Sequence, residues 1–315
     1  MKKPALRKLV IFGVGLIGGS VALALKKASA INKASAINNA GAINHVAPQI
    51  TGVGRTSESL QSALDLGVID IATNDVALAL KDADIVLIAA PVAQTPAILT
   101  SIKPHLDALT VITDAGSTKA DVLRCAKEIL GEQFNQFIGG HPIAGAEKSG
   151  VTAALADLYV NKNVVLTPTK NTNKQSIEAV TRLWQACGAN ISEMTAETHD
   201  SIFACVSHLP HLLAFALVND IAARPNAKQL FSFAASGFRD FTRIAGSSPE
   251  MWRDISLANK TALLNELSTY QDELSQLKQL LENEDGAGLQ ALFERASVAR
   301  NAWATSNTNQ NPLSC

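Results

Sequence analysis

Short apolar runs alternate with helix-like segments through the first half of the chain. The longest continuous run ends at Pro91, and such a run is typical of a strand buried on both faces of a parallel sheet. Strands that alternate with helices at this spacing predict a doubly wound α/β fold. We expect strands at Lys8–Phe12, Gln49–Val53, Ala83–Ala90, Thr110–Thr113, Phe137–Gly140 and Val164–Thr167.

The second half shows no further strand signal after about Lys170 and consists of long periodic segments rich in Ala and Leu. We therefore expect an α/β domain over residues 1–170 and an all-helical C-terminal domain over residues 171–302. Residues 303–315, rich in Asn, Ser and Thr, are expected to be a disordered tail. Helices are expected at Ile177–Ala186, Ala196–Asn219, Ala227–Ala235, Pro249–Leu281 and Leu289–Ala302.

A six-residue repeat separates the first helix, expected to end near Lys27, from the second strand. Lys27–Asn32 recurs as Lys33–Asn38, and Asn39–Asn44 is a degraded third copy. Hexad repeats also occur in β-helices, but three short copies cannot bury a solenoid core. We expect residues 27–44 to be an insertion that lengthens a surface loop, because loops tolerate added length at little cost in free energy.

Composition and charge favour a protein without nucleic-acid or membrane partners. The formal net charge is −1 and the sequence pI is about 6.6, so no basic surplus attracts anionic polymers or lipids. The four cysteines are scattered, which favours a reduced, cytoplasmic protein. The apolar run Leu9–Leu25 follows basic residues as in a signal peptide, but its glycines argue against export and against a membrane span.

A glycine pattern at the junction of the first strand and helix predicts a dinucleotide site. Gly13, Gly15 and Gly18 form G-x-G-x-x-G in the strand–turn–helix context that makes this motif specific. In a Rossmann-type domain these glycines permit a tight turn, close approach of a pyrophosphate, and helix–strand packing. Free N–H groups near Leu16 and Ile17 would bind the anion. A glycine-rich turn that binds nothing is the alternative.

The end of the second strand favours NADP over NAD. NAD sites place an acidic residue there for the ribose 2′-hydroxyl, whereas NADP sites use arginine and small hydroxyl side chains for the 2′-phosphate. This chain has Arg55, Thr56 and Ser57, and its first carboxylate is Glu58. The alternative is that Arg55 is only a solvated surface charge.

Two polar segments follow later strands, where doubly wound sheets bind ligands. The first, Asp114–Lys119, contains Ser117, and the second, Gly139–Gly150, contains His141. A histidine between glycines and a proline at a strand end can reach a substrate and transfer a proton near neutral pH. A structural histidine is the alternative, but the combination with Ser117 and the glycine loop favours catalysis.

The helical half carries three further polar motifs, in Thr198–Asp200, Ser207–His211 and Gly237–Ala245. Together with the glycine loop and the His141 loop, these segments resemble the prephenate/arogenate dehydrogenases, the cyclohexadienyl dehydrogenases of tyrosine biosynthesis. The similarity runs from about Leu9 to Trp252 and beyond, and the combination is more specific than any single motif.

The resemblance implies roles for five residues. It makes His141 the base that accepts the proton of a ring hydroxyl as hydride leaves, and it makes Ser117 the residue that positions this histidine and the nicotinamide. It further implies that Arg243 binds a substrate carboxylate and that His199 and His211 line the pocket.

The resemblance also implies the reaction and the assembly. The reaction would be oxidative decarboxylation of prephenate to 4-hydroxyphenylpyruvate, or of arogenate to tyrosine, with hydride transfer to NADP⁺. The helical domain would form a homodimer. The chain departs from the family at Ala146, where the family has a threonine, so one polar substrate contact is not carried over.

Other interpretations stay open at this point. A 3-hydroxyacid-type dehydrogenase of similar architecture would need a catalytic lysine in the helical domain. A non-catalytic NADP-sensing protein would keep the glycines but would be indifferent to His141 and Ser117. A metal site is a further alternative, although its candidate ligands show no evident open triad. Those candidates are His199, Asp200, His208 and His211.

Overall fold

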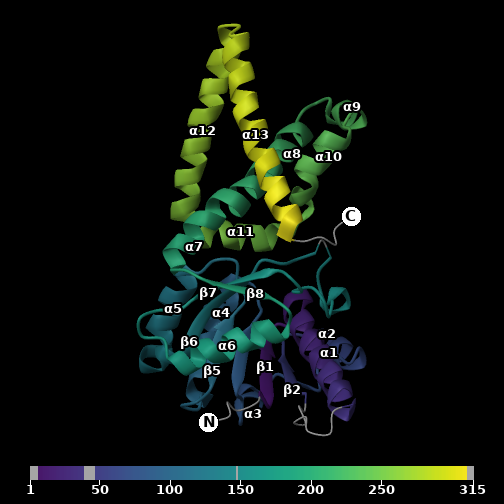
Figure 1. Cartoon of the computed structure of the whole chain (residues 1–315), viewed down its shortest axis with the longest axis vertical. Coiled ribbons are helices and arrows are strands. Elements are labelled where there is room, and N and C mark those ends of the chain that lie inside the picture. The colour runs from purple at the N-terminus through teal and green to yellow at the C-terminus, as the bar shows by residue number, and fades with distance from the viewer. Residues whose placement is uncertain (1–5, 39–46, 147, 311–315) are drawn as a thin grey trace. The chain divides into compact units, whose positions relative to one another are not determined.

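The structure, a computed structural model, describes residues 6–38, 47–146 and 148–310 of the chain. The chain forms two compact units, residues 1–260 and 261–315. The first unit contains an eight-stranded sheet covered by helices on both faces, followed by further helices (Figure 1). The expected Rossmann-type sheet followed by a helical region is therefore confirmed.

The strands lie side by side in the order β3-β2-β1-β4-β5-β6-β7-β8. The chain crosses over between β1 and β4, and their carboxyl ends border the crevice where such sheets bind ligands. All pairings are parallel except that of β6 with β7. The strands are β1 (Lys8–Phe12), β2 (Gln49–Val53), β3 (Ile71–Thr73), β4 (Ile85–Ile88), β5 (Val111–Asp114), β6 (Phe137–Pro142), β7 (Asn163–Thr167) and β8 (Asn190–Glu193).

Alternate residues of the central strands pack into two apolar layers. Leu9 and Ile11 of β1 belong to the layer under α1, α2 and α6, whereas Val10 and Phe12 belong to the layer under α3, α4 and α5. Burial on both sides accounts for the continuous apolar runs in the sequence. The helices are α1 (Leu16–Asn38), α2 (Ser57–Asp65), α3 (Val76–Leu80), α4 (Thr95–Ile102), α5 (Ala120–Leu130) and α6 (Lys174–Ala186).

Two strands are not indicated by the apolar pattern. β3 has only three residues, and neither β3 nor β8 contains a buried residue. These are the two edge strands, which need no continuous apolar run. Because β8 pairs in parallel with β7, the expectation that strands end after about Lys170 is wrong, and the sheet continues to Glu193.

The hexad repeat does not form the expected surface loop over its first two copies. α1 continues without a break through Lys27–Asn32 and Lys33–Asn38. These copies contain Ala and Lys, which favour helix, and neither Gly nor Pro, so nothing in them ends the helix near Lys27. The third copy lies in residues 39–46, outside the described residues.

One long helical run follows the sheet. It consists of α7 (Ala196–Phe203), a π-helical turn at Ala204–His208, and α8 (Leu209–Ala222), so the helix expected over this region is confirmed. By length and composition the run is the one described helix that could cross a membrane, a test that core helices of soluble proteins also pass. Three shorter helices complete the first unit, namely α9 (Ala227–Ser232), α10 (Ser236–Thr242) and α11 (Pro249–Ala258).

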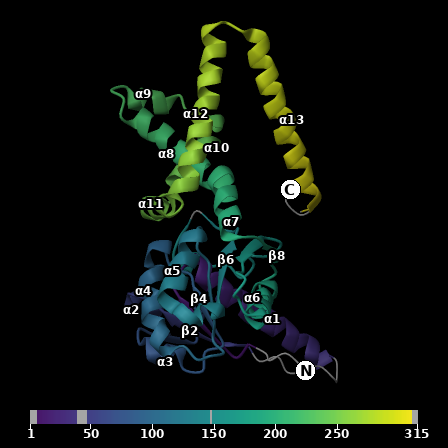
Figure 2. The ribbon, with the colours of Figure 1, turned by 90° about the vertical axis from the view of Figure 1, so that its left-hand side faces the viewer.

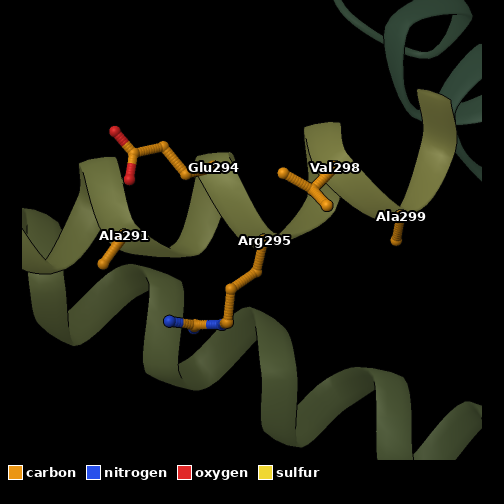
Figure 3. A pocket seen from close by; sticks show the side chains of 5 residues that line it. All are labelled: Ala291, Glu294, Arg295, Val298 and Ala299. Carbon is orange, nitrogen blue, oxygen red and sulfur yellow. The ribbon is translucent and has the colours of Figure 1, made fainter. Parts of the chain in front are cut away.

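The second unit consists of two helices joined by a tight turn (Figure 2). They are α12 (Lys260–Glu282) and α13 (Gly286–Gln310). Because α13 runs through residues 303–310, the expected disordered tail is wrong there, and residues 311–315 lie outside the described residues. Figure 3 shows a shallow pocket on this helix, lined by Ala291, Glu294, Arg295, Val298 and Ala299.

The turn between β1 and α1 depends on two glycines. Gly13 has a φ of 93°, and a Cβ atom there would lie 2.7 Å from the carbonyl oxygen of Ala89. A Cβ atom on Gly18 would lie 2.3 Å from the carbonyl oxygen of Gly13. A Cβ atom on Gly15, in contrast, would meet no atom within 4 Å. The fold therefore requires Gly13 and Gly18, but it does not require Gly15.

Gly18→Ala should lower the free energy of unfolding by about 1–3 kcal/mol, because the added methyl group overpacks rigid backbone. The matched variant Gly15→Ala should change it by less than about 0.5 kcal/mol. Urea unfolding followed by circular dichroism would compare the two variants with the wild type. Equal stabilities for Gly18→Ala and the wild type would contradict the packing role of this glycine.

Candidate functional site

The loop between β1 and α1 fits a dinucleotide pyrophosphate. The space beside Gly15 is open, and the first N–H groups of α1, at Leu16 and Ile17, have no acceptor within the helix. Gly13 donates its N–H to the carbonyl of Val53 at 3.0 Å, which ties the loop to the end of β2. The turn thus offers backbone donors and room for an anion at the crossover point of the sheet.

The start of α1 is held by the chain segment that follows the His141 loop. Tyr159 is buried and donates its hydroxyl hydrogen to the carbonyl of Ile17 at 2.7 Å. The N–H of Leu155 donates to the hydroxyl of Ser20 at 2.9 Å. Burial raises the pKa of Tyr159, so its hydroxyl stays protonated as a donor. The position of the glycine loop therefore depends on residues that follow β6.

A basic residue and two hydroxyl side chains follow β2. Arg55, Thr56 and Ser57 are exposed, and α2 begins at Ser57. The hydroxyl oxygens of Thr56 and Ser59 lie 2.8 Å apart at this helix start. A guanidinium group, hydroxyl groups and a helix N-terminus together suit a phosphate. The carboxylate of Glu58 lies in the first turn of the same helix.

The carboxylate at the end of β5 connects two loops of the candidate site. Asp114 is buried and forms an ion pair with the buried ammonium group of Lys119. Asp114 also accepts the backbone N–H groups of Gly116 at 2.9 Å and Gly140 at 3.0 Å. One carboxylate therefore fixes the backbone next to both predicted catalytic side chains.

The two glycines before His141 make room for this ion pair. A Cβ atom on Gly139 would lie 2.3 Å from the hydroxyl of Thr167 and 3.2 Å from Cδ of Lys119. A Cβ atom on Gly140 would lie 2.7 Å from the carbonyl oxygen of Asp114. Close packing of β6 against the ion pair explains why two glycines precede His141.

His141, at the end of β6, forms a hydrogen-bonded pair with a histidine of α7. Nδ1 of His141 lies 2.8 Å from Nε2 of His199, and Nδ1 of His199 lies 2.8 Å from Oδ1 of Asp200. Phe203 packs against both rings, with centroid distances of 4.9 Å and 4.4 Å. His141 is half-buried, whereas His199 and Asp200 are buried.

Asp200 connects this pair to the start of α5. Its side-chain oxygens accept the backbone N–H groups of Lys119 at 2.8 Å and Ala120 at 2.9 Å. Burial acts to raise the pKa of Asp200, but the hydrogen bonds from His199 and from these backbone groups outweigh it and lower the pKa below its usual value. Asp200 is therefore an ionised, fully hydrogen-bonded carboxylate.

Both histidines of the pair are neutral at neutral pH. Burial lowers the pKa of His141 well below its usual value, and repulsion by a proton on His199, by the charge of Lys119 and by a proton on His208 lowers it further. Burial also lowers the pKa of His199, although the hydrogen bond to Asp200 opposes this shift. A neutral histidine at a strand end can accept a proton, so this pair can act as a general base.

A second histidine network lies behind the first. Asn259 donates from Nδ2 to the carbonyl of Asp200 at 2.7 Å and to Nδ1 of His208 at 3.1 Å. Burial lowers the pKa of His208 to about 4. Because Asn259 lies between α11 and α12, the single helix expected over residues 249–281 is interrupted there. The interruption places a buried amide in the network.

His211 and Arg243 lie within electrostatic reach of each other. His211 stacks on Trp252 with ring centroids 3.6 Å apart and donates from Nδ1 to the carbonyl of Ser207 at 2.8 Å. Burial and the positive charge of Arg243 both lower the pKa of His211, whereas the hydrogen bond to Ser207 raises it. Arg243 is exposed directly after α10. A cation beside a neutral imidazole suits an anionic ligand.

The structure brings some of the expected residues into direct contact. It joins His141 to His199 and places Ser117, half-buried, in the loop between β5 and α5 whose end is bound to Asp200. Five supporting residues receive no catalytic, substrate-binding or cofactor-binding role from the sequence, where Asp200 is considered only as a metal ligand. No local pattern indicates their burial or their distant partners. They are Asp114, Lys119, Asp200, Trp252 and Asn259.

A metal site receives no support from this arrangement. Across the described ranges, no group of three or more His, Cys, Asp or Glu side chains could hold a metal ion. The side chains of the metal alternative instead hydrogen-bond to one another, to Asn259 or to backbone groups.

Family models match both parts of the chain. A model described as prephenate dehydrogenase, nucleotide-binding domain, matches residues 39–193, and one described as prephenate dehydrogenase, dimerization domain, matches residues 195–295. A prephenate dehydrogenase of Bacillus subtilis is 39% identical over 93% of this chain and 75% of its own length. A cyclohexadienyl dehydrogenase of Zymomonas mobilis is 32% identical over 95% of this chain and 97% of its own length.

Solved structures show the same fold along the whole chain. A prephenate dehydrogenase of Aquifex aeolicus, in complex with hydroxyphenyl propionate and NAD⁺, superposes with a TM-score of 0.85 at 36% identity, covering 96% of this chain and 99% of that one. An arogenate dehydrogenase of Synechocystis superposes with a TM-score of 0.75 at 29% identity, covering 94% and 99%. The resemblance found in the motifs is confirmed, and the chain belongs to the prephenate dehydrogenase family.

Proposed function

We propose that this chain is an oxidoreductase that oxidatively decarboxylates prephenate, arogenate or both, with NADP⁺ preferred over NAD⁺. The observation that carries the proposal is the neutral, half-buried His141, bound to His199 at the carboxyl end of a sheet that also carries a dinucleotide loop. Family membership supplies the substrate class, a cyclohexadienol with two carboxylates.

The proposed reaction combines hydride transfer, proton transfer and loss of CO₂. A dinucleotide held by the loop at Gly13–Gly18 would supply the hydride acceptor for the ring carbon that bears the hydroxyl. His141 accepts the hydroxyl proton as the ring carbon is oxidised to a ketone. The C–C bond to the ring carboxylate then breaks, CO₂ leaves, and the electron pair of that bond makes the ring aromatic. The resulting phenolate oxygen takes the proton back from His141. Because aromatisation drives the reaction, the side chains mainly have to orient the substrate and keep His141 unprotonated. Prephenate gives 4-hydroxyphenylpyruvate, and arogenate gives tyrosine.

We assign substrate binding to Arg243, with His211 and His199 lining the pocket and Ser117 positioning His141. Arg243 is exposed, and its charge lowers the pKa of His211. A substrate carboxylate can therefore reach its guanidinium group without a rearrangement of the apolar core. A planar guanidinium holds a carboxylate with two parallel hydrogen bonds. Arg243 therefore supplies the orientation that the decarboxylation needs.

The preference for NADP rests on the residues after β2. Arg55 is exposed beside two hydroxyl side chains at the start of α2, an arrangement that suits the 2′-phosphate. The related Aquifex aeolicus protein was crystallised with NAD⁺, so the family accommodates that cofactor. For this chain we propose that Arg55, Thr56 and Ser57 shift the preference toward NADP.

We further propose a cytoplasmic homodimer formed through the helical region. The region matched by the dimerization-domain model contains an apolar surface pocket near α9, beside which Phe233 is 82% exposed. Contiguous apolar side chains of this kind are typical of subunit interfaces. The described cysteines Cys125, Cys187 and Cys205 form no disulfide with one another, which supports a reducing compartment.

Two alternatives fit less well. A 3-hydroxyacid-type dehydrogenase would need a catalytic lysine in the helical domain, but the lysines after residue 195 in the described ranges, Lys228, Lys260 and Lys278, are exposed. A non-catalytic NADP-sensing protein would not require the hydrogen-bonded pair of His141 and His199 at the end of β6. Turnover of prephenate and arogenate with each cofactor, followed as reduced nicotinamide, tests the proposal. Absence of turnover with every combination would overturn it.

His141→Asn should lower kcat by about 10²–10⁴, the usual effect of losing a general base. NADP affinity should persist, because the glycine loop is untouched. The exposed His105 provides a matched control, since His105→Asn should keep the wild-type kcat. Stopped-flow and steady-state assays would measure both variants, and an unchanged kcat for His141→Asn would remove this residue from the mechanism.

The wild-type pH profile should follow the lowered pKa of His141. A base whose pKa is lowered stays unprotonated to more acidic pH, so kcat/KM should fall only below about pH 6.5, the usual histidine pKa. The profile of kcat/KM against pH in the free enzyme would show this. An acidic limb centred above that value would contradict the desolvated environment of the base.

Arg55→Asp should weaken NADP binding by about 1.5–3 kcal/mol, the scale of a lost hydrogen bond to a charged group. NAD binding should change little, because NAD lacks the 2′-phosphate. The ratio of kcat/KM for NADP to that for NAD measures the effect. A ratio equal to that of the wild type would show that other residues select the cofactor.

Arg243→Gln should raise KM for the dienoate about 10- to 100-fold, which corresponds to ~1.5–3 kcal/mol for a hydrogen bond to a charged group. KM for NADP should hardly move. Arg239, exposed on the preceding helix α10, is the matched control. Initial-rate kinetics with both substrates varied would decide, and a wild-type dienoate KM in Arg243→Gln would end this assignment.

A further inference from the structure

We propose that Asp200 is a positioning residue that, through His199, fixes the tautomer of His141 so that Nε2 is the nitrogen that accepts the substrate proton. This inference rests on the proposed role of His141 as the base. The contacts that carry it are the two 2.8 Å hydrogen bonds that connect Asp200, His199 and His141 in series.

The direction of the first hydrogen bond follows from the chemistry of a carboxylate. Ionised Asp200 can only accept hydrogen bonds, so Nδ1 of His199 must carry the hydrogen. The carboxylate is held in this orientation by two backbone donors at the start of α5. Asp200 therefore cannot turn away from His199 without leaving the N–H groups of Lys119 and Ala120 without their acceptor.

The direction of the second bond follows from the first. A neutral imidazole carries one hydrogen, so His199 with a hydrogen on Nδ1 has a free lone pair on Nε2. This lone pair must accept from His141, whose Nδ1 therefore carries the hydrogen. Neutral His141 then has its lone pair on Nε2, the one ring nitrogen left for the substrate hydroxyl.

Burial, helped by the charge of Lys119, keeps both rings neutral, whereas the charge of Asp200 favours a proton on His199 and gives Asp200 a second effect. Lys119, ion-paired with Asp114, approaches from the loop before α5, and neutral His208 approaches from the π-helical turn. When His141 accepts a proton, its ring becomes cationic while Nδ1 stays bound to His199. The negative charge of Asp200 then stabilises the cation through His199.

The tautomers can be measured without any turnover. Two-bond ¹H–¹⁵N spectra of the full-length protein with ¹⁵N-labelled histidine show which nitrogen of each of the six histidines carries hydrogen. Single substitutions at His141 and His199 assign their signals. We expect hydrogen on Nδ1 of both residues at neutral pH, and hydrogen on Nε2 of His141 would overturn the proposal.

Substitution of Asp200 then tests the function of the tautomer. Asp200→Ala removes the acceptor and should mix the tautomers of both rings, with a fall in kcat of about 10²–10⁴ and unchanged NADP affinity. Asp200→Asn can keep an acceptor oxygen toward His199 and should restore part of the Nδ1–H population and part of kcat. Wild-type kcat and tautomers in Asp200→Ala would overturn the proposal.

Controls separate positioning from folding and from the proposed function. Asp121, in the first turn of α5, is a neighbouring carboxylate, and Asp121→Asn should keep the tautomers and kcat of the wild type. Should Asp200→Ala fail to fold, the wild-type spectrum and Asp200→Asn still decide. A wild type without turnover of either dienoate would overturn the function, while its spectrum would still confirm or overturn the tautomer.

Discussion

The buried carboxylate of Asp114 is the contact on which the rest of the site depends. It neutralises Lys119 and accepts backbone N–H groups from Gly116 in the loop after β5 and from Gly140 in strand β6. Burial of an ion pair is favourable only when its remaining hydrogen-bonding capacity is satisfied, and loss of one partner costs about 3–5 kcal/mol. Because one of the backbone donors precedes His141, the energy that stabilises the ion pair also fixes the position of the base.

The two carboxylates near the histidines, Asp114 and Asp200, have opposite effects on the protons of the pair. Asp114 offsets the charge of Lys119, so the positive end of the pair repels a proton on His141 without leaving a bare charge in the core. Asp200 is hydrogen-bonded to His199, and its charge favours protonation of that ring. His141 therefore stays unprotonated before the reaction. When it accepts the substrate proton, the negative charge of Asp200 lies two hydrogen bonds away, through His199.

The sequence predicts the elements that have local patterns and misses those that depend on distant partners. The glycine loop, six strands, the run of α7 and α8, and the helices α9 and α13 follow from periodicity and turn chemistry. Helix α10 and the break between α11 and α12 do not. The sequence does not predict β3 and β8, because edge strands need no continuous apolar run. The hexad repeat shows the reverse error, since a duplicated insertion suggested a loop although the residues of its first two copies favour helix. In the site, His141 has a motif around it, whereas the burial of Asp114 and Asp200 follows only from the three-dimensional fold.

The π-helical turn explains how one helical run can serve both histidine networks. Pro210 lacks the N–H that would continue the α-helical pattern, and the run widens to a π-helix in the turn before it. The widened turn changes the angular spacing between α7 and α8, so residues on the two helices do not follow a single α-helical face. His199 faces the end of β6, whereas His208 reaches Asn259 and His211 stacks on Trp252. Pro210 therefore coincides with the change of direction that separates the two histidine networks.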